Sequence, residues 1–420
     1  MRSLILTLAL TFAAGTAQAA TLTTLKYGVY GPQNDALTLG QDGQLYGTAS
    51  GGTYDNGIVY KISTAGAFTT LANLKTSVSG QGSPGGLVFD SGGNIFGVGN
   101  DAAGASARET IFKLTPSGTL SRFATLGIAT YPNDGLTIDA SNNIYGVTPY
   151  GGANGYGTVF KVSSTGVSST LATFNQANGA FPANQLTLDA AGNIYGTTEN
   201  GGLGISQYNN GYGTLFKLSN TGVLTTLIEF SGLNGAYPRG KLAIDGNGNI
   251  FGTTTANTIF EYSQAGVFTT LAKFTGIDGL GTNPTGGLLL DAAGNLFGTT
   301  VNGGDTVFGL GKGYGTVFEL TKSGVLKTLA TFDNANGANP YAGLTADAFG
   351  NLYGTTQNGP NNIGTIFKLG DTGFVPFTAS VPEPATWALM LLGFGGIGAA
   401  MRRGNRRAAA KTAAEAHYLR

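Results

Sequence analysis

A six-residue motif, Asn-Ile-Tyr-Gly-Thr-Thr at 193–198, returns along most of the chain and constrains its fold more than any other feature. Seven copies or close variants are present, and their glycines stand at positions 47, 97, 146, 196, 252, 298 and 354. Successive glycines are separated by 50, 49, 50, 56, 46 and 56 residues. A fixed period of this length is typical of solenoids, propellers and other repeat arrays.

Each repeat is predicted to fold into four short antiparallel strands. In the copy that begins at Leu186, β-branched and alternating segments at 186–189, 193–198, 213–218 and 223–228 are bounded by Gly, Asn, Asp and Ser. Such segments are typical of strands joined by turns. Four antiparallel strands in about 50 residues match one blade of a β-propeller. The predicted fold is therefore all-β, a seven-bladed propeller of four-stranded antiparallel blades.

The second strand of each repeat is apolar on both faces, which indicates a sheet buried between two neighbours. Ile194 and Tyr195 point to opposite faces because side chains alternate along a strand. Gly196 leaves space where another backbone or an aromatic ring comes close. An aromatic residue recurs in the third strand of each repeat and is expected to lie in the core between blades. The alternative is that the seven aromatics form a platform on which sugars stack. These aromatics are Tyr60, Phe112, Phe160, Phe216, Phe260, Phe318 and Phe367.

An aspartate recurs in the turn between the first and second strands, at positions 139, 189, 245, 291 and 347. The segment from Asp245 to Asn249 resembles the start of a calcium-binding loop. It lacks a glycine at the sixth position and an acidic residue at the twelfth, where Ala256 stands. Aspartate readily accepts hydrogen bonds within its own turn. The aspartates are therefore interpreted as caps of their hairpins, and no metal site is predicted.

Composition excludes several classes of function. Charged residues are 10% of the chain, with 22 Lys+Arg and 22 Asp+Glu, so no nucleic-acid partner is expected. Cysteine is absent and the single histidine, His417, lies in the C-terminal tail. An exported propeller of this sequence therefore has no disulfide, no Cys/His or Ser/His/Asp nucleophile and no thiolate or imidazole zinc site. No cofactor is expected.

Paired carboxylates remain available, because glycoside hydrolysis needs two acidic residues and nothing else from the protein. Most acids here stand in turns or alternate with lysine in the third strand, where Lys217, Glu261 and Glu319 share one position. That pattern suggests solvated side chains. A carboxylate-dependent polysaccharide hydrolase or lyase is therefore the alternative, and a binding or scaffold module is the main hypothesis.

Both ends of the chain carry targeting features. Residues 1–19 combine Arg2, an apolar stretch and Ala17-Gln18-Ala19, which predicts a signal peptide cleaved after Ala19. Residues 20–379 then hold the propeller. Residues 380–384 hold a Pro-Glu-Pro motif, and the 17-residue apolar run 385–401 is at the short end for a transmembrane helix. The basic tail 402–420 is expected on the cytoplasmic side.

Two resemblances rest on these motifs. Asn-Ile-Tyr-Gly-Thr-Thr, Gly-Thr-Val-Phe-Lys at 157–161 and Pro-x-x-x-Leu-x-x-Asp at 182–189 resemble the GloVer tandem repeats of bacterial surface proteins, over roughly residues 30–370. That family implies a fold and a location and carries no assigned activity.

The C-terminal segment resembles the PEP-CTERM signal that exosortases process in Gram-negative bacteria. The sorting motif is Val381, Pro382, Glu383 and Pro384, and the arginines that flank the membrane are Arg402, Arg403, Arg406 and Arg407. The resemblance implies transient anchoring in the inner membrane, cleavage near Pro-Glu-Pro by an exosortase-type enzyme and delivery to the cell surface or beyond. The plain alternative is a permanent anchor with a proline-rich linker. Residues 408–420 depart from the family pattern, in which the chain usually ends sooner after the arginines.

A ring must also hide its last strand edge, because exposed edges invite aggregation. The segment from Thr21 to Tyr27 resembles a fourth strand but precedes the first complete repeat. It is predicted to pair with the third strand of the last repeat, at 364–369. The segment from Phe374 to Phe377 competes for this position and is weakened by its proline.

Uneven insertions suggest a ligand site. The loops from Glu199 to Tyr212 and from Val301 to Tyr314 are long, while Thr255 to Asn257 between them is short. Two long loops that flank a short one predict a cleft over the fifth blade, and this cleft would suit a neutral polysaccharide. The alternative is that these glycine-rich loops are simply mobile. The candidate ligand-binding residues are Tyr208, Tyr212, Asp305, Phe308, Lys312 and Tyr314.

Overall fold

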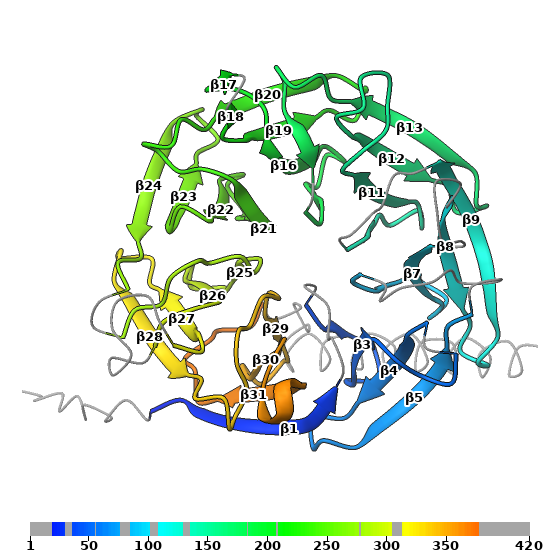
Figure 1. Ribbon diagram of the computed structural model, residues 1–420, viewed down its shortest axis with the longest axis vertical. Helices are drawn as coiled ribbons and strands as arrows, with labels where there is room; N and C mark the ends of the chain where they lie inside the picture. Colours follow the sequence, from blue (N-terminus) through cyan, green and yellow to red (C-terminus); the bar gives the residue numbers. More distant parts are fainter. Residues whose placement is uncertain are drawn as a thin grey trace, which may run out of the picture. The chain divides into compact units, whose positions relative to one another are not determined.

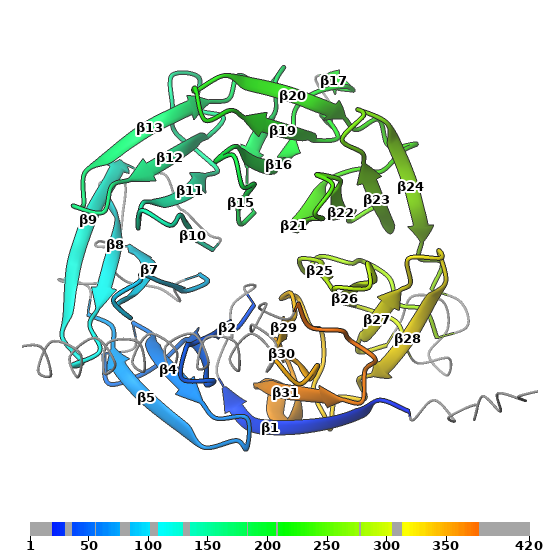
Figure 2. The same cartoon turned by 180° about the vertical axis from the view of Figure 1, so that it is seen from behind.

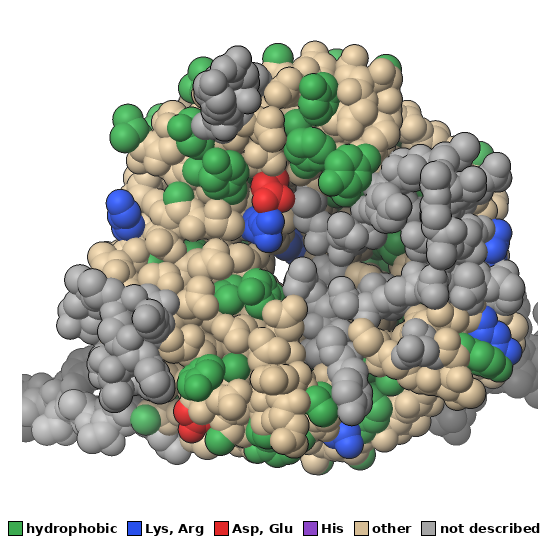
Figure 3. Space-filling view, in the orientation of Figure 1, with side chains coloured by type: hydrophobic (Ala, Val, Ile, Leu, Met, Phe, Trp, Pro, Cys, Tyr) green, Lys and Arg blue, Asp and Glu red, His purple; other side chains and the backbone are tan. Residues whose placement is uncertain are grey.

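The computed structural model describes residues 19–29, 36–54, 56–75, 85–100, 108–128, 135–182, 184–206, 209–276, 279–304 and 313–377. Figures 1 and 2 show their strands arranged as a ring of blades around a central axis. Seven antiparallel sheets form the blades, six of four strands and one with a fifth. The seven-bladed all-β propeller predicted from the repeats is confirmed. On the face that Figure 3 shows, the described side chains are largely uncharged, as expected of a chain with 10% charged residues.

The four strands of a blade follow one another from the ring's centre to its rim. The inner strands are β2 (Thr38–Leu39), β6 (Val88–Phe89), β10 (Thr137–Ile138), β15 (Thr187–Leu188), β21 (Pro238–Ile244), β25 (Leu289–Leu290) and β29 (Thr345–Ala346). The second strands, which carry the motif, are β3 (Leu45–Ala49), β7 (Ile95–Asn100), β11 (Ile144–Thr148), β16 (Ile194–Asn200), β22 (Ile250–Thr254), β26 (Leu296–Thr300) and β30 (Leu352–Thr356).

The outer half of each blade is a longer hairpin. The third strands are β4 (Ile58–Ile62), β8 (Arg108–Leu114), β12 (Thr158–Val162), β19 (Thr214–Leu218), β23 (Thr258–Tyr262), β27 (Thr316–Leu320) and β31 (Gly364–Gly370). The fourth strands are β5 (Phe68–Asn73), β9 (Leu120–Ile128), β13 (Ser168–Thr173), β20 (Leu224–Glu229), β24 (Phe268–Lys273), β28 (Leu326–Thr331) and, from the N-terminus, β1 (Thr21–Val29).

The motif glycine of every blade faces the recurrent aromatic of the third strand. Gly196 in β16 pairs with Phe216 in β19, and a Cβ added to Gly196 would lie 2.6 Å from the Phe216 ring. The same register and approach hold for Gly47–Tyr60, Gly97–Phe112, Gly146–Phe160, Gly252–Phe260, Gly298–Phe318 and Gly354–Phe367. All seven aromatics are buried. They form the core between blades, as predicted, and not a platform for sugars.

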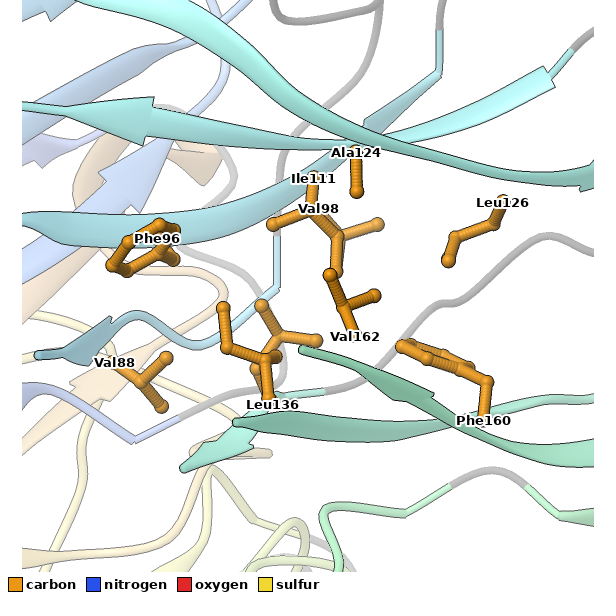
Figure 4. Close-up of a cluster of buried hydrophobic side chains, with 10 residues drawn as sticks. Val88, Phe96, Val98, Ile111, Ala124, Leu126, Leu136, Phe160 and Val162 are labelled. Carbon is orange, nitrogen blue, oxygen red and sulfur yellow. The ribbon is translucent and has the colours of Figure 1, made fainter. Parts of the chain in front are cut away.

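Each of the seven blade interfaces holds its own cluster of buried apolar side chains. Figure 4 shows the cluster of the second and third blades, where Val98 and Ile111 meet Val162. Four of these interfaces share an edge-to-face pair between the phenylalanine that follows a fourth strand and the recurrent aromatic of the next blade, which stabilises by about 0.5–1.5 kcal/mol beyond the area buried. These pairs are Phe174–Phe216, Phe230–Phe260, Phe274–Phe318 and Phe332–Phe367.

The N-terminal strand closes the ring as predicted. β1 pairs antiparallel with β31, from Thr21 opposite Gly370 to Val29 opposite Gly364. Its register shifts beside the aromatic Phe367, so that Leu25 forms a bulge. The fourth strands of the other six blades shift at the corresponding place. β1 therefore occupies the fourth-strand position of the seventh blade, and the competing segment from Phe374 stays outside the sheet.

Two expectations differ from the structure. The long connection after β16 is not merely a glycine-rich loop, because β17 (Ile205–Ser206) pairs there with β18 (Asn209–Asn210). The connection that enters this blade also holds a short strand, β14 (Ala180–Pro182), which pairs with β16. Glu319, expected to be solvated, is buried at 8% exposure. The reason is a cross-strand partner, because Lys327 lies opposite it and its Nζ is 3.4 Å from the carboxylate.

The targeting segments lie outside the described residues. This applies to residues 1–18 of the expected signal peptide, the sorting motif 380–384, the apolar run 385–401 and the tail 402–420. Within the described ranges the one helix is η1 (Pro360–Asn362), and no helix there is long and apolar enough to span a bilayer.

We expect removal of residues 20–28 to lower the melting temperature of the mature protein markedly. The deletion would expose the edge of β31 and open the apolar cluster that holds Val29 and Tyr353. Circular dichroism melts of the deletion variant and of a Tyr27→Ala control, whose side chain is exposed, measure the effect. Coincident melting curves for the deletion and the parent would show that β1 does not close the ring.

Candidate functional site

Tight turns and long connections emerge on opposite faces of the ring, because consecutive strands of a blade run antiparallel. The turns at 189–193 and 219–223 are closed by backbone hydrogen bonds of 3.0 and 2.9 Å. We call this side the hairpin face. The connections from second to third strands, which include β17–β18 and η1, lie on the other side. We call that side the loop face.

The aspartates of the hairpin face are occupied by their own turns. Asp189 Oδ1 accepts the backbone N–H groups of Ala191 and Asn193, and Oδ2 accepts the Asn193 amide and the Tyr195 hydroxyl. Asp139 and Asp347 have the same four kinds of partner. The interpretation as hairpin caps is confirmed. Across the described ranges no three acidic, histidine or cysteine side chains gather as metal ligands would.

These hydrogen bonds keep the carboxylates ionised. Burial raises the pKa of Asp189, but the hydrogen bonds from Asn193, Tyr195 and the backbone outweigh it and hold that pKa below its usual value. Burial, and then the bond to Asp189, raise the pKa of Tyr195 to about 12. A carboxylate of lowered pKa is a poor general acid at neutral pH. The role of the hairpin aspartates is therefore structural, because they stabilise their own turns.

The structure describes two of the six predicted ligand residues. Tyr212 and Tyr314 are partly buried and pack against apolar clusters at blade interfaces. They occupy the position of Tyr156 in the third blade, because the carbonyl of each of these three tyrosines accepts an N–H from the connection to the next blade. Part of each ring is therefore used in packing. Tyr208, Asp305, Phe308 and Lys312 lie outside the described residues.

An ion pair between the fourth and fifth blades was not anticipated from the sequence. Arg239 Nη2 lies 2.6 Å from Glu199 Oε1, which joins β21 to β16, and both side chains are partly exposed. The Arg239 Nε atom is buried and has no hydrogen-bond partner among the described residues. In Figure 3 an acidic and a basic side chain touch near the centre of the ring. The pair thus leaves a directed N–H donor beside a fixed carboxylate.

Neighbouring side chains hold this pair and extend it. Asn184 donates to Thr197 at 2.6 Å and accepts the Gly240 N–H at 2.9 Å, which ties the backbone next to Arg239 to the fourth blade. Tyr237 lies 6.1 Å, centroid to centroid, from the Tyr212 ring. All four residues lie at the loop-face ends of the fourth and fifth blades, and we call the ion pair together with the two tyrosines the four–five site.

A signal for this site was present in the sequence. The residue after the proline of the Pro-x-x-x-Leu segment before the inner strand is Asn133, Ala183, Arg239, Thr285 or Tyr341 in five successive repeats. Arg239 is the one cation in that series. Its partner, Glu199, is 40 residues away, and a repeat pattern from one chain does not show which residues of neighbouring blades meet.

The Gloeobacter/Verrucomicrobia repeat family matches residues 31–258 and 256–380, and the chain belongs to this family. The PEP-CTERM protein-sorting motif matches residues 380–407. The protein is thus a repeat propeller with a C-terminal PEP-CTERM motif, which implies export, sorting to the cell surface and processing by an exosortase. No curated protein matches the chain.

Several solved structures match most of the chain at low identity. A putative gluconolactonase is 16% identical with a TM-score of 0.41, covering 73% of this chain and 92% of its own. A luciferin-regenerating enzyme is 14% identical with a TM-score of 0.45, covering 72% and 94%. The gluconolactonase XC5397 from Xanthomonas campestris is 14% identical with a TM-score of 0.45, covering 86% and 93%. With TM-scores below 0.5 and identities of 14–16%, these likenesses carry no argument about function.

We expect Asp189→Asn to lower the stability of the propeller at pH 7 and to flatten its loss in acid. Since the folded pKa of Asp189 lies below the unfolded value of about 4, its contribution is complete above that value and is lost as the pH falls through the folded pKa. Melting temperatures between pH 7 and pH 2, with Ala191→Ser as control, measure this. An identical pH dependence in variant and parent would contradict a stabilising role for the ionised carboxylate.

Proposed function

We propose that this protein is a cell-surface or extracellular-matrix propeller that binds exopolysaccharide on its loop face. The observation that carries the proposal is the four–five site, which sets Tyr212, Tyr237 and the Glu199–Arg239 pair at the loop-face ends of two adjacent blades. By this proposal the protein acts as a binding or scaffold module. Its sorting signal would bring it to the place where such polymers are found.

The chemistry of the site favours a neutral saccharide. Partly exposed tyrosine rings offer apolar faces to a sugar ring. Arg239 presents N–H donors and Glu199 presents an acceptor, which together match the donor and acceptor character of sugar hydroxyls. Because the two charges neutralise each other, the pair offers little net attraction to a phosphate or a polyanion. The unpartnered Nε of Arg239 gains a hydrogen bond if a hydroxyl reaches it.

The sequence-based cleft over the fifth blade extends the same proposal. Tyr212 belongs both to the predicted set and to the four–five site. Tyr208 would add to the wall on the fourth blade, and Asp305, Phe308, Lys312 and Tyr314 would form the wall on the sixth. Among the described residues the fifth blade presents only a short turn there, where Asn257 accepts the Asn283 N–H at 2.6 Å.

Nothing in the described part of the chain favours the hydrolase or lyase alternative. Its hairpin aspartates with lowered pKa are held by turn hydrogen bonds, Glu319 is paired with Lys327, and Glu199 is paired with Arg239. A glycosidase needs one carboxyl group kept protonated near neutral pH and a second one on the other side of the scissile bond. Binding without turnover is therefore the function that we propose.

We expect the mature protein to bind neutral envelope polysaccharide, and a variant with Tyr208, Tyr212, Phe308 and Tyr314 changed to alanine to bind at least about tenfold more weakly. Each aromatic lost removes a face for stacking on sugar. Titration calorimetry measures the affinity. Tyr156→Ala is the matched control, because Tyr156 has the same structural position in a blade outside the cleft.

Equal affinity in the folded quadruple variant would show that the cleft is the wrong place. An Arg239→Ala variant then separates the two parts of the proposal. If Arg239→Ala loses binding while the quadruple variant does not, the ligand binds at the ion pair of the four–five site and not in the wider cleft. Shortening of the polymer, or release of unsaturated products, would instead establish the enzymatic alternative.

A further inference from the structure

Four successive blades expose a valine at one position of the hairpin face. Val167, Val223, Val267 and Val325 are 67, 60, 57 and 51% exposed. Each follows the glycine of the turn between third and fourth strands and donates its N–H to the Ser or Thr hydroxyl that begins that turn, at 3.0–3.1 Å. The first two blades carry Ala67 and Thr119 there. The exposed valines are thus confined to the third to sixth blades.

The C-terminal end of the propeller crosses the same face. After β31, Thr372 donates to the Gly350 carbonyl, the Val375 carbonyl accepts the Ala292 N–H, and the Val375 N–H donates to Asp291. Phe374 is buried on Phe297, with ring centroids 5.1 Å apart. Figure 2 shows this orange segment running across the near face from the seventh blade to the sixth. Beside it Phe349, in the turn of the seventh blade, is 90% exposed.

Because of this path, the C-terminal segment leaves the propeller from its hairpin face. The compact propeller unit ends at Pro376. Eight residues, 377–384, separate Pro376 from the apolar run that begins at Ala385, and eight residues span at most about 30 Å. While the run 385–401 is held in a bilayer, the hairpin face is therefore tethered close to that bilayer.

We propose that the hairpin face of the third to seventh blades rests on the membrane surface in the unprocessed precursor, with Val167, Val223, Val267, Val325 and Phe349 inserted among the lipid headgroups. Exposed apolar side chains grouped on one face are typical of a membrane or protein contact. The tether raises the local concentration of the bilayer, so weak insertion is sufficient. The loop face then points away from the membrane, towards the medium.

Charge does not favour this contact. In the third and fourth blades Lys161 and Lys217 balance the hairpin aspartates and lie over the Tyr145 and Tyr195 rings. In the fifth and sixth blades Glu261 and Glu319 hold the corresponding position, so no third-strand lysine balances Asp245 or Asp291. We therefore expect the apolar side chains to drive insertion, with neutral bilayers bound at least as well as anionic ones. The inference rests on the expectation that residues 385–401 anchor the precursor, and not on the polysaccharide proposal.

The absence of cysteine makes the test direct. The full-length chain is reconstituted in neutral phosphatidylcholine vesicles with one cysteine at a time, Val325→Cys, Asn154→Cys on the loop face or Leu391→Cys in the apolar run. Each is labelled with an environment-sensitive dye. The labels at 325 and 391 should shift to the blue and be quenched by nitroxide-bearing lipids. The label at 154 should be quenched by aqueous iodide alone.

Replacing Val167, Val223 and Val267 with serine should reduce the lipid quenching of the label at 325, since the inserted area is smaller. Lipid quenching at 391 without lipid quenching at 325 would overturn the proposal. Protection of the label at 325 from iodide in detergent as well as in vesicles would also overturn it, because it would indicate a second copy of the chain on this face. Absence of lipid quenching at 391 would remove the anchor on which the inference rests.

Discussion

The close approach of an aromatic ring to a glycine on the neighbouring strand is the interaction on which this propeller depends. A Cβ at Gly196 would lie 2.6 Å from the Phe216 ring and 2.8 Å from Leu186, so the ring, the glycine and the inner-strand leucine fill one space. Repeated seven times, this contact packs the middle of every sheet. With no cysteine in the chain, stability comes from such packing and from closure of the ring by β1.

The repeat motif allowed the fold to be predicted because its information is local. The Gly196–Phe216 pair, the Asp189 turn and the fourth-strand character of the segment from Thr21 each follow from residues close together in one repeat. The four–five site does not. Glu199 and Arg239 belong to different blades, and their meeting depends on how blades stack. The expectation that Glu319 is solvated is wrong for a related reason, since its burial depends on Lys327, which lies opposite it on the next strand.

The two faces of the ring have different chemistry. On the hairpin face, short turns hold their aspartates in fixed hydrogen bonds and present valines of nearly equal exposure. On the loop face, connections differ in length from blade to blade, and the Glu199–Arg239 pair and the tyrosines lie between them. The regular hairpin face can therefore make the same contact in successive blades. The variable loop face can present a different binding surface on each blade.

A double-mutant cycle on the glycine–aromatic pair tests most directly whether this contact determines the packing of the blade. Gly196→Ala is measured by urea unfolding in the parent and in a Phe216→Leu background. We expect Gly196→Ala to cost about 1–3 kcal/mol in the parent, because the new methyl group collides with the ring, and less than half of that once the ring is removed. An equal cost in both backgrounds would contradict the claim that this contact determines the packing of the blade.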